Sequence, residues 1–381
     1  MIPAPKAFLV TTAKNEAPYF LEWVAYHQEI GFTDIVVYQN DSDDLTHETL
    51  AALRDLGAIQ YFYNRADVGM HQVRAYTRAA ALPAYQQADW AMALDMDEFL
   101  LIKTGDGMLS DLMKVLPESD CLHLNWRIFG NSGYEVMTEE LVTDRFKMAN
   151  YQLGEVDNFG AFKCMFRPTL FNRPGIHKPN KALIAEDKIR YTNGSGLAPE
   201  QYLLKNFNST DPGGCEFAQV NHYIVRDLCS FMLKSARGSA HQANRTIGHR
   251  YWRMRNKNFA IDDSMQPFQA RIKVRMAVLD DASGGKLMKL RETAIFTHLA
   301  RYYTMLQEPQ IRAFRAFCKA NPNAVDYTKT PRDTASETLD DTKTTSKTGK
   351  ARKPASMTAT AGSVSKKAAP KQPTPSDHAT T

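Results

Sequence analysis

The first hundred residues alternate between short apolar runs and longer stretches with helical spacing, and this order constrains the fold more than any other feature of the sequence. It predicts strands at 7–11, 35–39, 59–63 and 90–95, and helices at 16–30, 46–56 and 69–82. Strands separated by helices of this length form right-handed crossovers and a mostly parallel sheet covered by helices on both faces. We therefore predict an α/β fold whose ligands bind outside the carboxyl ends of the strands.

The sequence changes character beyond residue 120, which suggests further regions. Residues 121–129 are typical of another strand, and residues 140–225 mix short strands with loops rich in Asn, Gly and Pro. The composition then becomes helical and basic. We predict three parts: an α/β domain at 1–240, a helical C-terminal extension at 241–327 and a tail at 328–381.

The tail accounts for the basic character of the chain. Residues 328–381 contain no aromatic residue and hold ten Lys or Arg against five acids, so residues 1–327 carry 37 charges of each sign. Such a composition cannot bury enough apolar surface to fold, and we expect the tail to be disordered. With a neutral body, the pI of about 8.8 gives little support for nucleic-acid binding.

Cysteine usage and hydropathy suggest a compartment. The five cysteines are widely scattered without a C-x-x-C pair, which favours reduced thiols over a disulfide framework or a zinc site. The N-terminal residues lack the pattern of a signal peptide, and no stretch approaches the ~20 apolar residues of a membrane helix. We expect a soluble cytoplasmic protein, with peripheral contact at the inner membrane surface as one option for the basic tail.

Three residues with carboxylate side chains, Asp95, Asp97 and Glu98, lie at the end of the fourth predicted strand, in the stretch DWAMALDMDEFLLI. Two ionised carboxylates a few ångströms apart repel each other unless a cation lies near them. A divalent metal removes that penalty, and oxygen ligands suit Mg²⁺ or Mn²⁺. The alternative is a solvated acidic turn, but the buried strand on one side and the apolar residues on the other favour a metal site.

The sequence resembles glycosyltransferases of the GT-A fold, in particular the family-2-like group that is similar to glycosyltransferase family 92. The resemblance rests on stretches that occur in the expected order across residues 7–238. They are VTTAKNEAPYFLEWVAYHQEIGFTDIVVYQNDSDD, DWAMALDMDEFL, WRIFGNSGY, KCMFRP followed by HKP, and NHYIVRDLCSFMLKSARG. The resemblance implies that the α/β domain is catalytic and transfers a hexosyl or related sugar from a nucleotide-sugar donor, with a UDP-sugar as the expected donor. The expected acceptor is a hydroxyl group of a glycan, a lipid-linked molecule or another compound, as in polysaccharide biosynthesis.

The same resemblance implies roles for the acidic residues. Asp95 and Asp97 match the D-x-D that holds Mn²⁺ or Mg²⁺ against the donor diphosphate, where the metal offsets charge on the leaving group. His222 matches a third metal ligand, and its alternative is a histidine satisfied within the core. The role of Glu98 is open: it could orient Asp95 or a metal-bound water, or it could cap the turn.

Two loops are expected to hold the nucleotide. Thr11, Asn15 and Glu16 follow the first strand and match the nucleotide pocket of the family, with ordinary helix capping as the alternative. Asn40 and Asp41 follow the second strand, where relatives contact the base, and their alternative is an Asx turn.

Basic and polar helix residues are candidates for diphosphate contact. Gln72 and Arg74 open the third helix, which lies near the diphosphate in relatives, although a surface arginine is the commoner fate. Lys234 and Arg237 follow His222 on a basic helix and could close over the same group or form a solvated face.

The base that an inverting transferase needs is not evident. A carboxylate within hydrogen-bond reach of the acceptor hydroxyl is required. Asp157 is the candidate by placement, and Glu98 is the second. Trp126 would suit a sugar face or the core, and a direct role for His177 is an open alternative.

Two other function classes are compatible with parts of the sequence. One is a catalytically silent nucleotide-binding or scaffolding module, tethered by its basic tail to an anionic surface or to nucleic acid. The intact D-x-D-E stretch argues against it. The other is a metal phosphohydrolase, which would need more His and Asp ligands near the strand ends than the sequence offers.

Overall fold

The structure is a computed structural model of the chain and describes residues 5–65, 69–155, 159–237 and 247–326. These residues fall in one compact unit, Met1–Pro331. The predicted disordered tail lies outside the described residues, and the boundary at residue 240 stays a prediction. None of the helices in the described ranges is long and apolar enough to cross a membrane.

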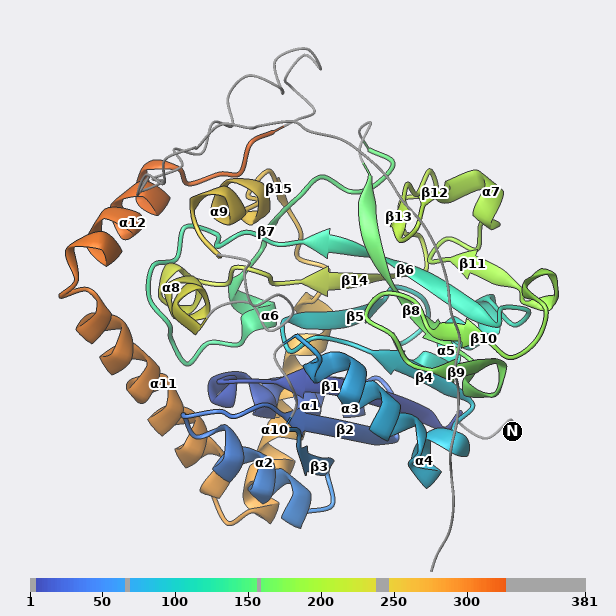
Figure 1. The fold of residues 1–381 in the computed structure, drawn as a ribbon, viewed down its shortest axis with the longest axis horizontal. Helices are drawn as coiled ribbons and strands as arrows, with labels where there is room; N and C mark the ends of the chain where they lie inside the picture. The colour runs from blue at the N-terminus through green and yellow to red at the C-terminus, as the bar shows by residue number, and fades with distance from the viewer. Residues whose placement is uncertain (1–4, 66–68, 156–158, 238–246, 327–381) are drawn as a thin grey trace, which may run out of the picture. The chain divides into compact units, whose positions relative to one another are not determined.

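The N-terminal part of the fold is the predicted alternation of strands and helices (Figure 1). Its strands are β1 (Ala7–Ala13), β2 (Asp34–Gln39), β3 (Gln60–Tyr63) and β4 (Trp90–Ala93). Its helices are η1 (Ala17–Tyr19), α1 (Phe20–Glu29), α2 (Thr46–Asp55), α3 (His71–Ala80) and α4 (Pro83–Gln86). The strands pair in parallel in the order β3-β2-β1-β4, so the predicted α/β fold is confirmed.

Alternation along β1 explains why both faces of the sheet are covered. Leu9 packs into the apolar cluster that contains α1, whereas Phe8 and Val10 pack into the cluster that contains α3. Successive side chains of a strand point to opposite faces, so an unbroken apolar run fits a strand buried on both sides.

The second half of the sheet is mixed. Its main strands are β5 (Glu98–Ile102), β6 (Cys121–Ile128), β8 (Gly160–Phe166) and β14 (Ala218–His222), and they continue the order as β4-β8-β6-β14-β5. β8 is antiparallel to β4 and β6, β14 is parallel to β6, and β5 is antiparallel to β14. Therefore β6 and β14 run in the same direction as β1, β2 and β4, and all five strands end at one edge.

Short strands complete the described part of the fold. They are β7 (Met148–Ala149), β9 (Phe171–Arg173), β10 (Asn180–Ala182), β11 (Tyr191–Asn193), β12 (Leu203–Lys205), β13 (Asn208–Ser209) and β15 (Ala260–Ile261). Short helical turns in the same part are α5 (Leu109–Val115), α6 (Val142–Arg145), η2 (Pro168–Leu170), η3 (Glu186–Lys188) and α7 (Pro199–Tyr202).

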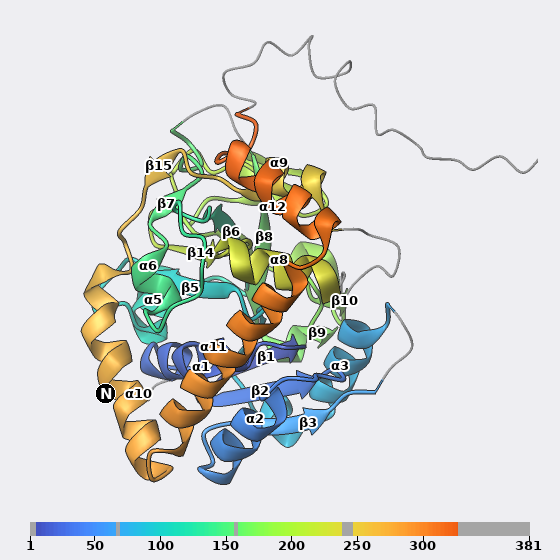
Figure 2. The same ribbon diagram turned by 90° about the vertical axis from the view of Figure 1, so that its left-hand side faces the viewer.

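The C-terminal region is helical, as predicted. It contains α8 (Leu228–Arg237), α9 (His249–Arg255), η4 (Gln266–Phe268), α10 (Gln269–Ala282), α11 (Lys286–Met305) and α12 (Pro309–Ala320). α10 packs against α1, and α11 contacts η1, α2 and α8 (Figure 2). The last long helices therefore cover the first helices of the chain and α8, which follows β14.

Candidate active site

Most of the candidate side chains gather at one edge of the sheet. The segments after β1 and β4 and the last residue of β14 meet there because these strands run in the same direction. The antiparallel strand β5 begins at this edge, so that His222 at the end of β14 is directly paired with Glu98 at the start of β5. The topology thus brings the D-x-D-E turn and His222 together although Glu98 and His222 are 124 positions apart in the sequence.

Asp95 lies between an amide and an ammonium group. Its Oδ1 accepts a hydrogen bond of 2.9 Å from Nε2 of Gln72, and its Oδ2 lies 3.1 Å from Nζ of Lys163. Burial raises the pKa of Asp95, but the charge and hydrogen bond of Lys163 together with the neighbouring His222 outweigh it, and the pKa is lowered. The side chain is 32% exposed, so the carboxylate is only partly covered at the strand edge.

Asp97 contacts two groups from later in the chain. Nζ of Lys234 donates to its Oδ2 at 2.8 Å, and Nε2 of His222 lies 3.4 Å from its Oδ1. Burial alone would raise the pKa of Asp97, but Lys234 and His222 lower it well below the usual value. Burial lowers the pKa of His222, although the attraction of Asp97 acts in the opposite direction. The lowered pKa favours the neutral imidazole.

Glu98 lies beneath the turn and is fully buried. Its Oε2 accepts the backbone N–H of Asp95 at 2.8 Å and lies 3.1 Å from Nζ of Lys163. Burial raises the pKa of Glu98 to about 8, although Lys163 acts in the opposite direction. Of the roles left open for Glu98, this geometry favours capping the turn and orienting Asp95 over acting as a base.

A second buried ion network fixes the loop after β1. Glu16 binds two guanidinium groups, since its Oε2 accepts from Arg226 and its Oε1 from Arg237, each at 2.7 Å. Arg226 also donates to the carbonyl of Met96 at 2.9 Å and lies over the ring of Tyr19. Burial raises the pKa of Glu16, but Arg226 and Arg237 outweigh it and the pKa is lowered. Glu16 therefore connects the first loop to the D-x-D turn through Arg226.

A cavity of about 620 Å³ opens next to these networks. Residues from the loop after β1, from the D-x-D turn, from α8 and from α11 line it. The polar residues among them include Asn15, Glu16, Asp43, Asp97, Arg226, Lys234, Arg237, His298 and Arg301. The cavity is large enough for a small-molecule ligand.

The predicted nucleotide residues are only partly brought together. Asn15 and Glu16 line the cavity, whereas Thr11, Asn40 and Asp41 are not among the described residues around it. Thr11 is fully buried, with its hydroxyl 3.4 Å from the Thr12 carbonyl.

The side chains of the loop after β2 form hydrogen bonds with nearby residues of the same part of the fold. Oδ1 of Asn40 accepts from Asn64 at 2.7 Å, and Asp41 accepts from the hydroxyl of Tyr63. Asn15 pairs with Asp43 through side chain and backbone, at 2.7 and 2.9 Å. These contacts hold the loops in place, and a role in binding a base stays a prediction.

The remaining predicted residues differ in their surroundings. Gln72 contacts Asp95, whereas Arg74 is exposed on α3. His177 stacks on Phe207 and lies against Trp126, whose ring also contacts His222. Asp157, the first candidate for the base, lies outside the described residues.

Lys163 and Arg226 were not identified from the sequence. Lys163 is a fully buried lysine in the apolar strand GAFKCMF, and this mismatch is the signal that could have revealed it. Arg226 has a positive backbone φ of 52°, which is uncommon outside glycine and which no sequence pattern indicates.

The contribution of α11 was also missed. His298 lies 2.9 Å from Oδ2 of Asp44, and Arg301 pairs with Asp43 at 2.8 Å. These contacts hold α11 against the loop before α2. A wall of the cavity thus comes from a helix to which the sequence assigned no function.

We expect Asp44→Asn to destabilise the protein by about 1–3 kcal/mol at pH 7, because a buried ionised acceptor is lost. Burial raises the pKa of Asp44, but hydrogen bonds from His298 and Thr46 outweigh it and lower the pKa. A carboxyl with a lowered pKa stabilises the fold above its unfolded pKa of 3.8 and loses this effect as the pH falls. Urea unfolding should show a difference at pH 7 that shrinks towards pH 3.

The control for this prediction is Asp55→Asn, which changes an exposed aspartate that pairs with its neighbour Arg54. It should leave the free energy of unfolding nearly unchanged at both pH values. A difference for Asp44→Asn that stays constant with pH would contradict an ionised Asp44 that stabilises the fold.

The donor set at the strand edge fits a divalent metal in part. Carboxylate oxygens and a neutral imidazole are ligands that Mn²⁺ and Mg²⁺ accept. Asp97 and His222 face each other, but the ligand atoms of Asp95, Asp97 and His222 do not all lie within 4.8 Å of one another. Lys163 and Lys234 supply positive charge beside the two aspartates, so the repulsion predicted from the sequence is already offset by side chains.

Comparison with known proteins points to one family. Residues 11–195 match the profile of glycosyltransferase family 92, which confirms the resemblance predicted from the sequence. A curated protein of rice (Oryza sativa subsp. japonica), described as a glycosyltransferase family 92 protein, is 29% identical over 138 residues. The match covers 35% of this chain and 23% of the rice protein, so the chain spans about a quarter of the length of that relative.

Solved structures show only a distant likeness. TarS residues 1–349 from S. aureus, in complex with UDP-GlcNAc, is 16% identical with a TM-score of 0.27, covering 43% of this chain and 46% of that one. The mannosyltransferase PcManGT from Pyrobaculum calidifontis, in complex with GDP-Man and Mn²⁺, is 12% identical with a TM-score of 0.29, covering 84% of this chain and 86% of that one.

Proposed function

From the match of residues 11–195 to glycosyltransferase family 92, we propose that this chain is a glycosyltransferase that moves a sugar from a nucleotide-sugar to a hydroxyl acceptor. The family match and the cavity at the strand edge support this proposal together. Ligands of such sheets bind at the carboxyl ends of the strands, and the cavity lies there.

The charge of the cavity wall is the observation that carries the proposal. The cavity wall carries four cations and three acids, which are Arg226, Lys234, Arg237 and Arg301 against Glu16, Asp43 and Asp97. The wall therefore has an excess of positive charge that favours an anion, and arginine forks match the geometry of phosphate oxygens. A nucleoside diphosphate is the anion that this function requires.

Binding would redistribute the ion pairs that the structure shows. Lys234 holds Asp97 and the carbonyl of Ile224 in place, at 2.8 and 2.9 Å, and can turn its ammonium group towards a phosphate. Glu16 orients both guanidinium groups, so that Arg226 and Arg237 face the cavity at little further entropic cost.

The proposal includes a divalent ion, Mn²⁺ or Mg²⁺. Asp97 and His222 would hold it with Asp95 beside them, and when bound it offsets negative charge on the leaving diphosphate. Gln72 and Lys163 orient Asp95, and Glu98 holds the turn beneath it. These positioning contacts keep the carboxylates ionised and directed to the strand edge.

We further propose a UDP-sugar as donor and inversion at the anomeric carbon, with Asp157 as the base to test first. A glycan or lipid-linked hydroxyl is the acceptor class. A cytoplasmic location, with the basic tail in peripheral contact with the inner membrane surface, is part of the same proposal.

We expect UDP to raise the melting temperature of the full chain, and Mn²⁺ to enlarge this shift, because both bind the folded state only. The measurement is a thermal unfolding series with UDP, Mn²⁺, both and neither, followed by incubation with a panel of nucleotide-sugars to read donor hydrolysis. An equal UDP-induced shift of the melting temperature with and without Mn²⁺ would contradict the proposal that a divalent metal takes part in UDP binding.

The donor panel also separates the alternatives. A silent nucleotide-binding module would show the UDP shift without hydrolysis of any donor. Release of inorganic phosphate from UDP itself would favour a phosphohydrolase. No shift with any nucleotide would overturn the proposed function.

A further inference from the structure

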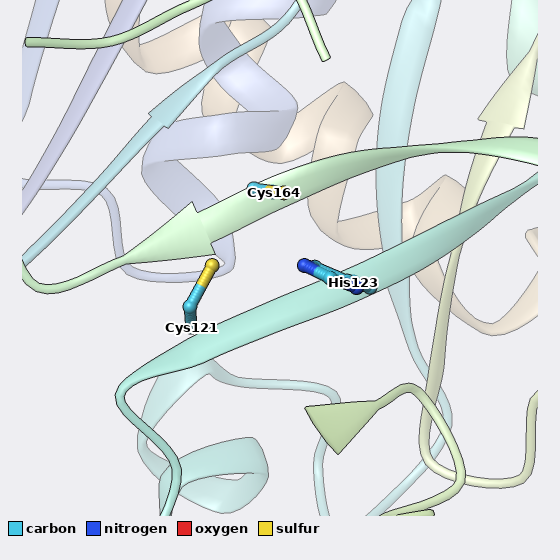
Figure 3. Close-up of side chains that lie close together, drawn as sticks. All are labelled: Cys121, His123 and Cys164. Atoms are coloured by element: carbon cyan, nitrogen blue, oxygen red, sulfur yellow. The ribbon is translucent and has the colours of Figure 1, made fainter. Parts of the chain in front are cut away.

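Three potential metal ligands from neighbouring strands meet on one face of the sheet (Figure 3). They are Cys121 and His123 of β6 and Cys164 of β8. His123 is directly opposite Cys164 in the antiparallel pair, and Cys121 is two positions from His123 on the same strand. Residues two apart in a strand share a face, so the register places all three side chains together.

The cluster is buried. Cys121 is fully buried, and His123 and Cys164 are 2% and 4% exposed. One ligand atom of each residue lies within 4.8 Å of the others. Ligands of one tetrahedral Zn²⁺ lie about 3.5–3.8 Å apart, given Zn–S and Zn–N distances near 2.3 and 2.0 Å. Small side-chain rotations would bring the three atoms to that spacing.

The environment of His123 fits a metal ligand. A hydrogen bond of 2.9 Å joins its Nδ1 to the hydroxyl of Tyr202, and its ring stacks on Phe162 at 4.2 Å and 11°. Its Nε2 is buried and has no hydrogen-bond partner among the described residues. In the tautomer whose Nδ1–H donates to Tyr202, Nε2 keeps its lone pair for a metal, which is how histidine ligands are commonly oriented.

The burial of the two thiols also bears on the binding of a cation. Thiolate is the form of cysteine that binds metals. A thiolate enclosed in an apolar interior is costly unless a cation accompanies it.

We propose that Cys121, His123 and Cys164 bind one Zn²⁺. Each thiol releases its proton to solvent on binding, and two thiolates then balance the two positive charges, so that the buried site is neutral. Sulfur and imidazole ligands select Zn²⁺ over the Mn²⁺ or Mg²⁺ that oxygen ligands favour. A water molecule can complete the fourth position, as in other zinc sites with three protein ligands.

The expected role of this zinc is to fix the pairing of β6 and β8. Lys163, which precedes Cys164, points to the other face of β8 and holds Asp95 and Glu98. A zinc ion that ties β8 to β6 would therefore steady the strand that presents Lys163. This site is separate from the acidic turn in its residues and in its ligand chemistry.

The test is the metal content of the full-length protein purified from zinc-supplemented cells without chelator. We expect about one zinc per chain, reduced at least about tenfold in Cys121→Ser and Cys164→Ser. Cys318→Ser, which changes a buried thiol on α12, is the matched control and should keep the zinc. Asp97→Ala should also keep it, which distinguishes this site from the acidic turn.

Wild-type protein provides the test if the serine variants do not fold. Replacing zinc by Co²⁺ should give the intense thiolate-to-cobalt absorption in the near ultraviolet. A protein without zinc that binds neither Zn²⁺ nor Co²⁺ after reduction would overturn the proposal. A Cys121–Cys164 disulfide in the purified protein, found by peptide mapping, or another metal in stoichiometric amount would also overturn it.

Discussion

Asp97→Ala is expected to reduce sugar transfer by about 10²–10³-fold, the effect of removing one group that stabilises charge in the transition state. Asp97 is the carboxylate that meets both His222 and Lys234, from β14 and α8. Its loss removes a proposed metal ligand and frees Lys234 from its position. The measurement is the initial rate of nucleoside diphosphate release with the best donor of the panel, or the UDP-induced thermal shift in Mn²⁺ if no donor reacts.

Asp55→Ala is the matched control for this prediction. Asp55 does not line the cavity, its side chain is 61% exposed and it pairs with Arg54 at the surface. We expect its rate to stay within a few-fold of the wild type. Equal rates for Asp97→Ala and the wild type would rule out a catalytic role for the D-x-D turn.

Arg226→Met is expected to destabilise the protein by about 3–5 kcal/mol, because it leaves a buried acid with one of its two cations removed. Arg226 binds Glu16, the carbonyl of Met96 and the ring of Tyr19, and it is 7% exposed. Urea unfolding at pH 7 measures the change. The nucleotide-induced thermal shift should fall as well, since the loop after β1 loses its link to the D-x-D turn.

Arg301→Met removes an arginine of the same cavity whose partner is exposed. We expect a change of at most about 1 kcal/mol for this surface pair. If both arginine variants had the same small effect, the buried network around Glu16 would not be a source of stability.

The sequence predicted the parts of the fold that depend on local patterns. The strands and helices of the first hundred residues follow the apolar spacing, and β6 lies where residues 121–129 indicated a strand. Asp95, Asp97 and His222 were selected through the family resemblance, and the structure brings them to one edge. Their order along the chain and the direction of the strands account for this agreement.

The missed contacts depend on long-range register, which local patterns do not contain. Lys163 reaches Asp95 because β8 runs antiparallel beside β4, and sequence spacing gives no indication of that pairing. Likewise, Cys121 and Cys164 are 43 residues apart and have no spacing typical of a zinc site, yet the β6–β8 register brings them together. Scattered cysteines were therefore a poor guide to their neighbours in space.

The contribution of α11 to the cavity wall has a consequence for biosynthesis. Asn15 leaves the ribosome early, whereas Arg301 emerges only after most of the chain has been made. Because N-terminal segments fold first during translation, the sheet can assemble while the cavity still lacks the wall that α11 provides. A nascent chain stopped before residue 286 would thus have its acidic turn but not the enclosure around it, and ligand capture would begin only near the end of synthesis.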